Sequence, residues 1–460
     1  PQTWLDFGAS QLKVTRAYYA KYGRINEILS ENREILEGFH KDVSRMCKEK
    51  ERKRLATFNS EQFLRAILVM DIEQLSLRGT VIRIDDSEFL RRFVGISYGA
   101  VMDYTTLSKV YKAIRPQTWK RMNALLGQYA IEEEMIRGES LRVDTTAYET
   151  NIHYPTDSSL LGDGYRVLSR WISVIRDYDS EAVRSGRLQE GSVKRLVQRL
   201  ARGTYYKEKN RKKLRRLYRA LIGHVEHVLA WSMETERECE ARMAGGRYDL
   251  GTERIIRRLI AQRAAFELGL RKALRQARRR VLDGEMVPNS EKIFSLFETH
   301  TELLKRGKAG KQVEFGHMVL LHQVENKFIS DYEVFKKRVS DESMVDDILD
   351  RHEKVFGRVP ENFAADKGFY ESVERLDWLE TKITNVSIGK KGNRTLEEIE
   401  REHDPVFKSL QRFRAGIEGT ISFLKRCFKM ARCLYRSFKT YCSSVGSHVF
   451  AHNLVVLARL

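Results

Sequence analysis

The spacing of hydrophobic residues predicts helices over most of the chain. Residues 1–57 and 59–134 carry apolar side chains at intervals of three and four among many charged ones, as amphipathic helices do. From Asp157 to about Glu285 the pattern is again helical and free of proline, and only Ala244–Gly251 clearly interrupts it. This interruption predicts a hairpin of two long antiparallel helices. The N-terminal helices can form a helix-turn-helix-like DNA-binding unit or a plain helical support.

Extended segments flank the long helical stretch on both sides. Ser140–Tyr148 alternates apolar and polar residues and predicts a strand that carries Asp144. Asn362–Phe369 predicts a buried strand ending in Asp366 and a glycine. The other predicted strands are Val313–Val324, Lys327–Val334 and Lys382–Val386, and the other predicted helices are Asp341–Phe356, Glu371–Leu379, Gln411–Phe428 and a last one near Ser443–Leu460.

The order of these elements predicts an α/β fold. An antiparallel trio of strands is followed by parallel strands with covering helices, which excludes an all-helical protein. The chain of 460 residues is too long for a single hydrophobic core. We therefore expect three parts: a helical N-terminal region (1–137), a domain with a mixed sheet (138–156 with 286–460), and a basic helical insertion (157–285).

The segment Gln411–Phe428 carries the most specific arrangement of charges. On a helix its apolar residues fall within an arc of roughly 80°. Arg414, Glu418 and Lys425 form a second stripe, roughly 40° wide, along the edge of that arc. These charges therefore face the seam between the helix and the core. One acid between two bases suits a metal ligand flanked by phosphate-binding cations.

Two further acids can meet Glu418. If the strands that carry Asp144 and Asp366 are neighbours, their carboxylates lie at one end of the sheet, and the helix at its side brings Glu418 to the same place. Three carboxylates so close together repel one another and would normally be protonated. A divalent cation bound among them reverses this and keeps them ionised. Oxygen ligands without a His or Cys cluster favour Mg²⁺, with Mn²⁺ as a substitute. Two such ions about 3.5–4 Å apart can promote phosphoryl transfer.

Basic residues gather in two blocks of the helical insertion. The net charge is +20, from 83 Lys and Arg against 63 Asp and Glu. From Lys194 to Arg219 there are 12 bases and one acid, and from Arg254 to Arg280 there are 10 bases and one acid. Phosphate contacts relieve the repulsion within such blocks, so a nucleic acid partner is favoured over solubility alone. The candidate DNA-backbone contacts are Lys194, Arg195, Lys212, Lys213, Arg215 and Arg216.

The three acidic segments resemble those of the DDE transposases of bacterial insertion sequences. The resemblance is carried by LRVDTTAYETNIHYPTDSSLL around Asp144, VPENFAADKGFY around Asp366, and QRFRAGIEGTISFLKR around Glu418. In the last segment Arg414, Glu418 and Lys425 match the spacing of the family signature Y-x2-R-x3-E-x6-K. The resemblance implies a ribonuclease H-like core in which the three acids hold two Mg²⁺ ions.

The same resemblance implies a function and partners. It implies binding of terminal inverted repeats, strand cleavage by water, and joining when the freed 3′-hydroxyl attacks target DNA. It also implies a homodimer on DNA, a bacterial cytoplasmic location at the nucleoid, and DNA-end binding by the N-terminal region. Gln411 stands at the tyrosine position of the signature and is a further candidate DNA contact. Only 51 residues separate Asp366 from Glu418, so the extra material of this chain instead follows the first catalytic strand.

Several alternatives stay open at this stage. Glu149, Asp157 and Asp331 are rival carboxylates, and Asp331 is the reserve candidate because it lies on a predicted inner strand. Trp171 and the pair 205–206 are more typical of packing than of base stacking. A non-catalytic DNA-binding protein derived from such an enzyme, or a stand-alone nuclease, would share the same residues. The sequence has no run of 18 apolar residues, which predicts a cytosolic protein without a membrane partner.

Overall fold

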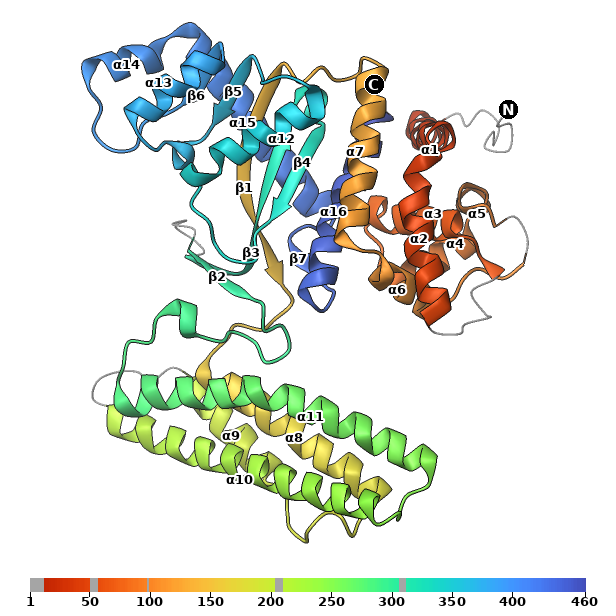
Figure 1. Ribbon diagram of the computed structural model, residues 1–460, viewed down its shortest axis with the longest axis vertical. Coiled ribbons are helices and arrows are strands. Elements are labelled where there is room, and N and C mark those ends of the chain that lie inside the picture. The colour runs from red at the N-terminus through yellow and green to blue at the C-terminus, as the bar shows by residue number, and fades with distance from the viewer. Residues whose placement is uncertain (1–11, 50–56, 97–98, 203–209, 306–311) are drawn as a thin grey trace. The chain divides into compact units, whose positions relative to one another are not determined.

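The computed structural model describes residues 12–49, 57–96, 99–202, 210–305 and 312–460 (Figure 1). Predictions that concern residues 1–11 and 50–56, and the tyrosines Tyr205 and Tyr206, lie outside these ranges. The chain forms two compact units, residues 1–151 with 304–460 and residues 152–303. Within the described ranges, no helix combines the length and the apolar character that a bilayer span requires. The predicted division into three parts stays a prediction.

The first unit contains a seven-stranded mixed sheet with the order β2-β3-β1-β5-β6, in which β4 also pairs with β3 and β7 with β1. The pairs β1–β3 and β3–β4 are antiparallel, whereas β1–β5 and β5–β6 are parallel. The predicted α/β fold is therefore confirmed. The strands are β1 (Ser140–Thr150), β2 (Glu302–Lys305), β3 (Val313–Gln323), β4 (Ile329–Val334), β5 (Asn362–Ala365), β6 (Asn385–Ile388) and β7 (Arg432–Cys433).

Helices surround this sheet and share one hydrophobic core with it. The almost wholly buried helix α16 packs against α7, α3 and β4, and so joins the N-terminal helices to the sheet (Figure 1). The N-terminal helices are α1 (Lys13–Glu31), α2 (Glu34–Glu49), α3 (Ser60–Ile72), α4 (Leu77–Asp86), α5 (Glu88–Val94), α6 (Tyr104–Ala113) and α7 (Pro116–Glu132). The later ones are α12 (Val345–Phe356), α13 (Val373–Lys382), α14 (Leu396–His403), α15 (Pro405–Cys427) and α16 (Phe438–Leu457).

The structure differs from the predicted elements after β5 in three places. The strand expected at Lys382–Val386 is β6, which begins only at Asn385, because α13 continues to Lys382. The helix α14 was not predicted, although Thr395 and Glu398 form a capping box at its start. The helix α15 begins earlier than Gln411, at Pro405, because the Asp404 carboxylate accepts hydrogen bonds from the next two free backbone N–H groups.

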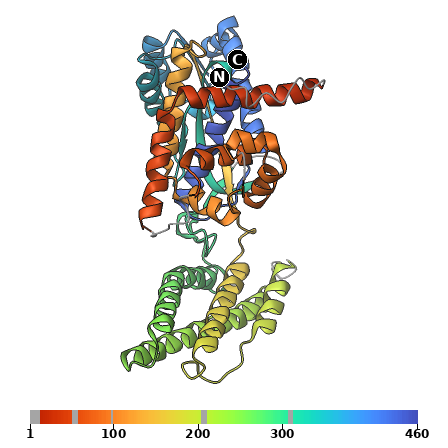
Figure 2. The same ribbon diagram turned by 90° about the vertical axis from the view of Figure 1, so that its right-hand side faces the viewer.

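The second unit is a helical bundle with its own core. Its long hairpin is formed by α10 (Arg211–Ala244) and α11 (Leu250–Ala277), joined at the predicted interruption. The helices α8 (Asp157–Tyr178) and α9 (Glu190–Ala201) pack beside this hairpin, as both ribbon views show (Figures 1 and 2). Trp171 is buried and donates its indole N–H to the Leu259 carbonyl, so its predicted packing role is confirmed. A short π-helical turn (Arg278–Asp283) ends the bundle's last helix.

Candidate active site

The pairing of β1 with β5 brings the first two acids to the same level of the sheet. These strands are parallel, and Arg142 lies opposite Ala364. Asp144 lies two residues after Arg142, still in β1, and Asp366 lies two residues after Ala364, directly after the end of β5. Because neighbouring strands are about 4.8 Å apart, the two backbones are adjacent at this level. The predicted meeting of Asp144 and Asp366 is therefore a consequence of strand register.

The helix α15 supplies the third acid from beside the sheet. Ile417, Leu424 and Phe428, at its C-terminal half and end, are buried in the core of the first unit. This packing fixes the rotation of the helix about its axis. The neighbouring stripe, with Glu418 and Lys425, consequently faces a cavity rather than bulk solvent alone. The side chain of Glu418 is 63% exposed, so it is the most accessible acid of the three.

All three predicted acids line one open cavity of ≈ 770 Å³. Arg414 and Lys425, the two bases of the predicted helical stripe, line it as well. Its lining consists of Asp144, Thr145, Thr146, Leu304, Lys305, Met318, Arg338, Asp341, Asp366, Arg414, Glu418, Ile421, Ser422, Lys425 and Arg426. Four carboxylates and five basic side chains thus meet in one space, and they come from separate parts of the chain.

Arg414 lies between the first and third acids. Its Nη1 is 3.9 Å from Oδ2 of Asp144, and its Nη2 donates a hydrogen bond of 3.0 Å to Oε1 of Glu418. The side chains of Arg414 and Asp144 are each 17% exposed, so this contact is largely shielded from water. A guanidinium between two carboxylates offsets part of their mutual repulsion. The same group can also bind a phosphate, for which it offers further N–H donors.

A fourth acid, Asp341, lies beside Asp366. A methyl group at Gly368 would be 2.6 Å from Oδ1 of Asp366 and 2.8 Å from Oδ2 of Asp341, which places both carboxylates around this glycine. Oδ1 of Asp366 accepts a hydrogen bond of 2.6 Å from the Gly368 N–H. Burial and, secondly, the charge of Asp366 raise the pKa of Asp341. Asp341 is not among the predicted site residues, because its only signal in the sequence is that of an acid at the start of a predicted helix.

The donors around the cavity fit a hard divalent cation. They are carboxylates without a His or Cys neighbour, and Oδ1 of Asp341 is buried without a hydrogen-bond partner. In the described part of the chain, however, no three His, Cys, Asp or Glu side chains already stand close enough to enclose an ion. Arg414, in contact with both Asp144 and Glu418, occupies part of that space. Asp144, Asp366 and Glu418, with Asp341 beside them, are the residues that would hold a metal.

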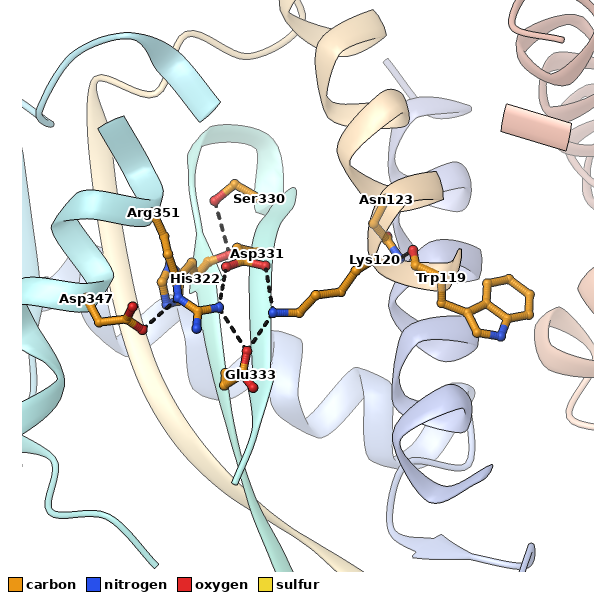
Figure 3. A network of polar contacts seen from close by, with 9 residues as sticks. All are labelled: Trp119, Lys120, Asn123, His322, Ser330, Asp331, Glu333, Asp347 and Arg351. Atoms are coloured by element: carbon orange, nitrogen blue, oxygen red, sulfur yellow. Dashed lines mark hydrogen bonds and ion pairs between the residues drawn. The ribbon is translucent and has the colours of Figure 1, made fainter. Parts of the chain in front are cut away.

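The rival carboxylates lie outside this cavity. Asp331, the reserve candidate, belongs to an ion-pair network that ties α7 and α12 to β4 (Figure 3). In this network Arg351 is 3.1 Å from Asp331 and 2.9 Å from Glu333, and Lys120 is 2.5 Å from Glu333. These contacts give Asp331 a structural role. Two other rivals are also engaged elsewhere, Glu149 by Arg432 at 3.2 Å and Asp157 by Arg280 at 2.7 Å.

Gln411 faces the sheet from the first half of α15. Its amide nitrogen donates to the carbonyl and the hydroxyl of Ser387, at 2.9 and 3.0 Å. A weaker contact of 3.4 Å reaches the carbonyl of Ala365, the last residue of β5. The side chain thus holds α15 against β5 and β6, immediately before Asp366. A DNA contact by Gln411 stays a prediction.

The predicted DNA-binding bases of the insertion are mostly at its surface. Lys194 and Arg195 of α9 and Lys212, Lys213 and Arg216 of α10 are exposed. Arg215 is half-buried instead, and its Nε donates to the Val281 carbonyl at 3.3 Å. By contrast, many bases of α11 are paired with acids, among them Arg257 with Glu253, Arg263 with Glu236 and Glu267, and Arg271 with Glu267. The α9–α10 side therefore offers the more accessible positive charge.

The mixed sheet, its covering helices and the acidic cavity are consistent with a ribonuclease H-like core. Residues 275–454 match the family model for the transposase DDE domain. This part of the chain is therefore a DDE transposase domain, whose chemistry is phosphoryl transfer on DNA and which generally uses divalent metal. The matched range includes Asp366 and Glu418, whereas Asp144 lies before it. Comparison with curated proteins and with solved structures gave no match.

Substitution of Gly368 by alanine is expected to disturb the cavity without unfolding the chain. The added methyl group would overlap carboxylate oxygens of Asp366 and Asp341, so both side chains must turn away. Displacing groups that orient such a site commonly costs about 10–100-fold in activity, and we expect a loss of this size in DNA cleavage. Gly419→Ala is the control, because a methyl group there meets no atom within 4 Å. Wild-type cleavage by Gly368→Ala would contradict this geometry.

Proposed function

We propose that this protein is a DNA transposase that binds the ends of its element, cuts them and joins them to target DNA. The observation that carries the proposal is the common cavity of Asp144, Asp366 and Glu418, flanked by Arg414 and Lys425. These five residues come from β1, the end of β5 and α15. Their common location supports the three acids that the family resemblance implies. Asp144 enters the site through the β1–β5 pairing, although it lies outside the matched range.

Each of these side chains has a distinct part in the proposed reaction. Asp144, Asp366 and Glu418 are the ligands for Mg²⁺, or for Mn²⁺ in its place. A bound pair of such ions would supply activation of the attacking oxygen and stabilisation of the leaving oxygen at phosphorus. Arg414 and Lys425 bind non-bridging phosphate oxygens and hold the scissile phosphodiester over the acids. Arg414 would exchange part of its contact with Glu418 for the phosphate when DNA enters.

The other parts of the chain supply DNA contacts. The exposed bases of α9 and α10 bind the sugar–phosphate backbone of the element end without reading its sequence. The helical N-terminal region is the remaining candidate for recognition of the inverted repeat. A homodimer would hold two ends together, since cutting and joining must be coordinated between both ends of one element.

The proposal is tested with the DNA that flanks the coding sequence. The purified full-length chain is incubated with a plasmid that carries these flanks, with Mg²⁺, with Mn²⁺ or with EDTA. We expect cuts at the element ends with either metal, none with EDTA, and joined products when target DNA is added. Binding without any metal-dependent cutting would support the non-catalytic alternative. Cutting that requires no element ends and yields no joined product would support a stand-alone nuclease.

A further inference from the structure

A second group of basic residues borders the candidate active site on a wall that α15 does not form. Lys305 ends β2, and Arg338 follows shortly after β4; both line the cavity that contains Asp144. Lys336 and Lys337 directly precede Arg338 in the sequence. All four side chains are exposed. We call these four residues, Lys305 with Lys336–Arg338, the second basic rim.

The backbone beneath the second basic rim is firmly held. β4 pairs with residues 319–323 of β3, and the N–H of Phe335 continues this pairing with a bond of 3.0 Å to the Met318 carbonyl. The carbonyl of Phe335 in turn accepts a hydrogen bond of 3.0 Å from Nδ1 of His317. Leu304, Met318 and Ala147 form a small apolar cluster on which Phe335 packs. Lys305 and Lys336 follow directly after Leu304 and Phe335, so their positions are fixed beside the catalytic strand.

The second basic rim makes few electrostatic contacts with the described part of the protein. In the described ranges, no hydrogen bond or ion pair engages the side chains of Lys305, Lys336, Lys337 or Arg338. Arg338 acts only at longer range, where its charge lowers the pKa of Asp341 and so opposes the larger effect of burial. Arg351, on α12, shows the contrast, because it contacts three acids within 3.1 Å. Four exposed cations without acidic partners, held beside a cavity, are suited to bind a polyanion.

We infer that the second basic rim binds the backbone of the DNA that receives the cut end, while Arg414, Lys425 and Arg426 hold the end itself. This inference rests on the proposed function, and it assigns the target DNA to one wall of the cavity. Joining requires two DNA segments at the same acids, and their phosphates repel each other. Bases on a single wall could neutralise only one of the two segments. Bases on two walls, from α15 and from the β2–β4 side, can neutralise both.

The test separates cutting from joining. The variant K336A/K337A, which leaves the cavity-lining Arg338 in place, is compared with the wild-type chain and with K354A/K408A. The control removes two exposed bases of the same unit that, like Lys336 and Lys337, do not line the cavity. One assay measures cutting at the element ends. A second assay supplies a pre-cut end and a plasmid target and measures joining, at several salt concentrations.

We expect the second-rim variant to cut within about twofold of the wild type and to join at least about tenfold more slowly. Lower salt should restore part of the joining, and the log–log slope of target binding against salt should fall by about 0.9 for each phosphate that the variant no longer neutralises. The control should cut and join like the wild type. Joining at the control's level, or an equal reduction of cutting and joining, would overturn the inference. A wild-type chain that cuts no DNA would instead refute the proposed function itself.

Discussion

Replacing Asp144, Asp366 or Glu418 by alanine is expected to abolish DNA cleavage while DNA binding persists. Each substitution removes one of the carboxylates that would hold the metal at the scissile phosphate. Loss of one group that stabilises transition-state charge costs on the order of 10²–10³-fold, and loss of a metal ligand should cost at least as much. Binding should persist, because removing an acid from the cavity takes away a charge that repels phosphate. Gel-shift and cleavage assays on the same preparations measure the two quantities.

Two control substitutions make this expectation specific. Asp350→Ala removes an exposed acid of α12 that does not line the cavity, and it should cut normally. Asp331→Asn weakens the network around Arg351 and should lower stability rather than the rate of cutting. A triad variant that cuts at the wild-type rate would remove its residue from the site. A larger loss of cutting in Asp331→Asn than in Asp144→Ala would return the reserve candidate to consideration.

Substitution of Arg142 by methionine is expected to give the largest loss of stability. Arg142 lies two residues before Asp144 on the same face of β1, and it is only 6% exposed. Its Nε donates to Oε1 of Gln323 at 2.8 Å, and its Nη1 donates to the Phe413 carbonyl of α15. The guanidinium also lies 4.4 Å from the centre of the Phe413 ring. Burial lowers the pKa of Arg142 to about 10.

Methionine would preserve much of the packing and remove every hydrogen bond of the side chain. Gln323 would keep its bond of 2.8 Å to the Thr420 hydroxyl, but its side-chain carbonyl oxygen would be left without the Arg142 donor. The Phe413 carbonyl would lose its charged donor and keep only the bond within α15. An unsatisfied buried acceptor costs about 1–3 kcal/mol, so we expect the free energy of unfolding to fall by about 2–4 kcal/mol. Cutting should fall as well, because Arg142 links β1, which carries Asp144, to α15, which carries Glu418.

Urea unfolding and cleavage assays measure both effects. Arg412→Met is the matched control, since Arg412 is an exposed residue of α15, the helix that Arg142 contacts. The close approach of Arg142 also depends on Gly416, where a methyl group would be 2.3 Å from Nη1 of Arg142. Unchanged stability of Arg142→Met would show that this buried network does not hold α15 in place.

The sequence was sufficient where the site depends on local periodicity. Arg414, Glu418 and Lys425 share one stripe because a helix repeats every 3.6 residues, and all three line the same cavity. The strands that carry Asp144 and precede Asp366 were also found from their own patterns. Their order along the chain, with the antiparallel pairs first, was enough to predict the mixed sheet.

Tertiary structure alone decided which side chains surround these acids. Asp341 reaches Asp366 because the segment between β4 and α12 passes the end of β5, and no local pattern encodes that approach. Asp331 sits on β4, as predicted, yet its contacts with Lys120 and Arg351 come from helices on either side of this strand in the chain. The second basic rim likewise depends on β2 and β4 sharing one partner strand.

The amino-acid sequence by itself determined most of the helices and strands, the basic insertion and the stripe of Arg414, Glu418 and Lys425, because each follows from short-range spacing and charge. Only the folded chain determined the level at which β1 meets β5, the rotation of α15 and the arginine that links them. Those features arise from long-range strand pairing and from burial, which join residues far apart in the chain, such as Arg142 and Ala364. The residues that carry the chemistry can therefore be recognised from the local sequence, whereas their assembly into one site depends on the packing of the core.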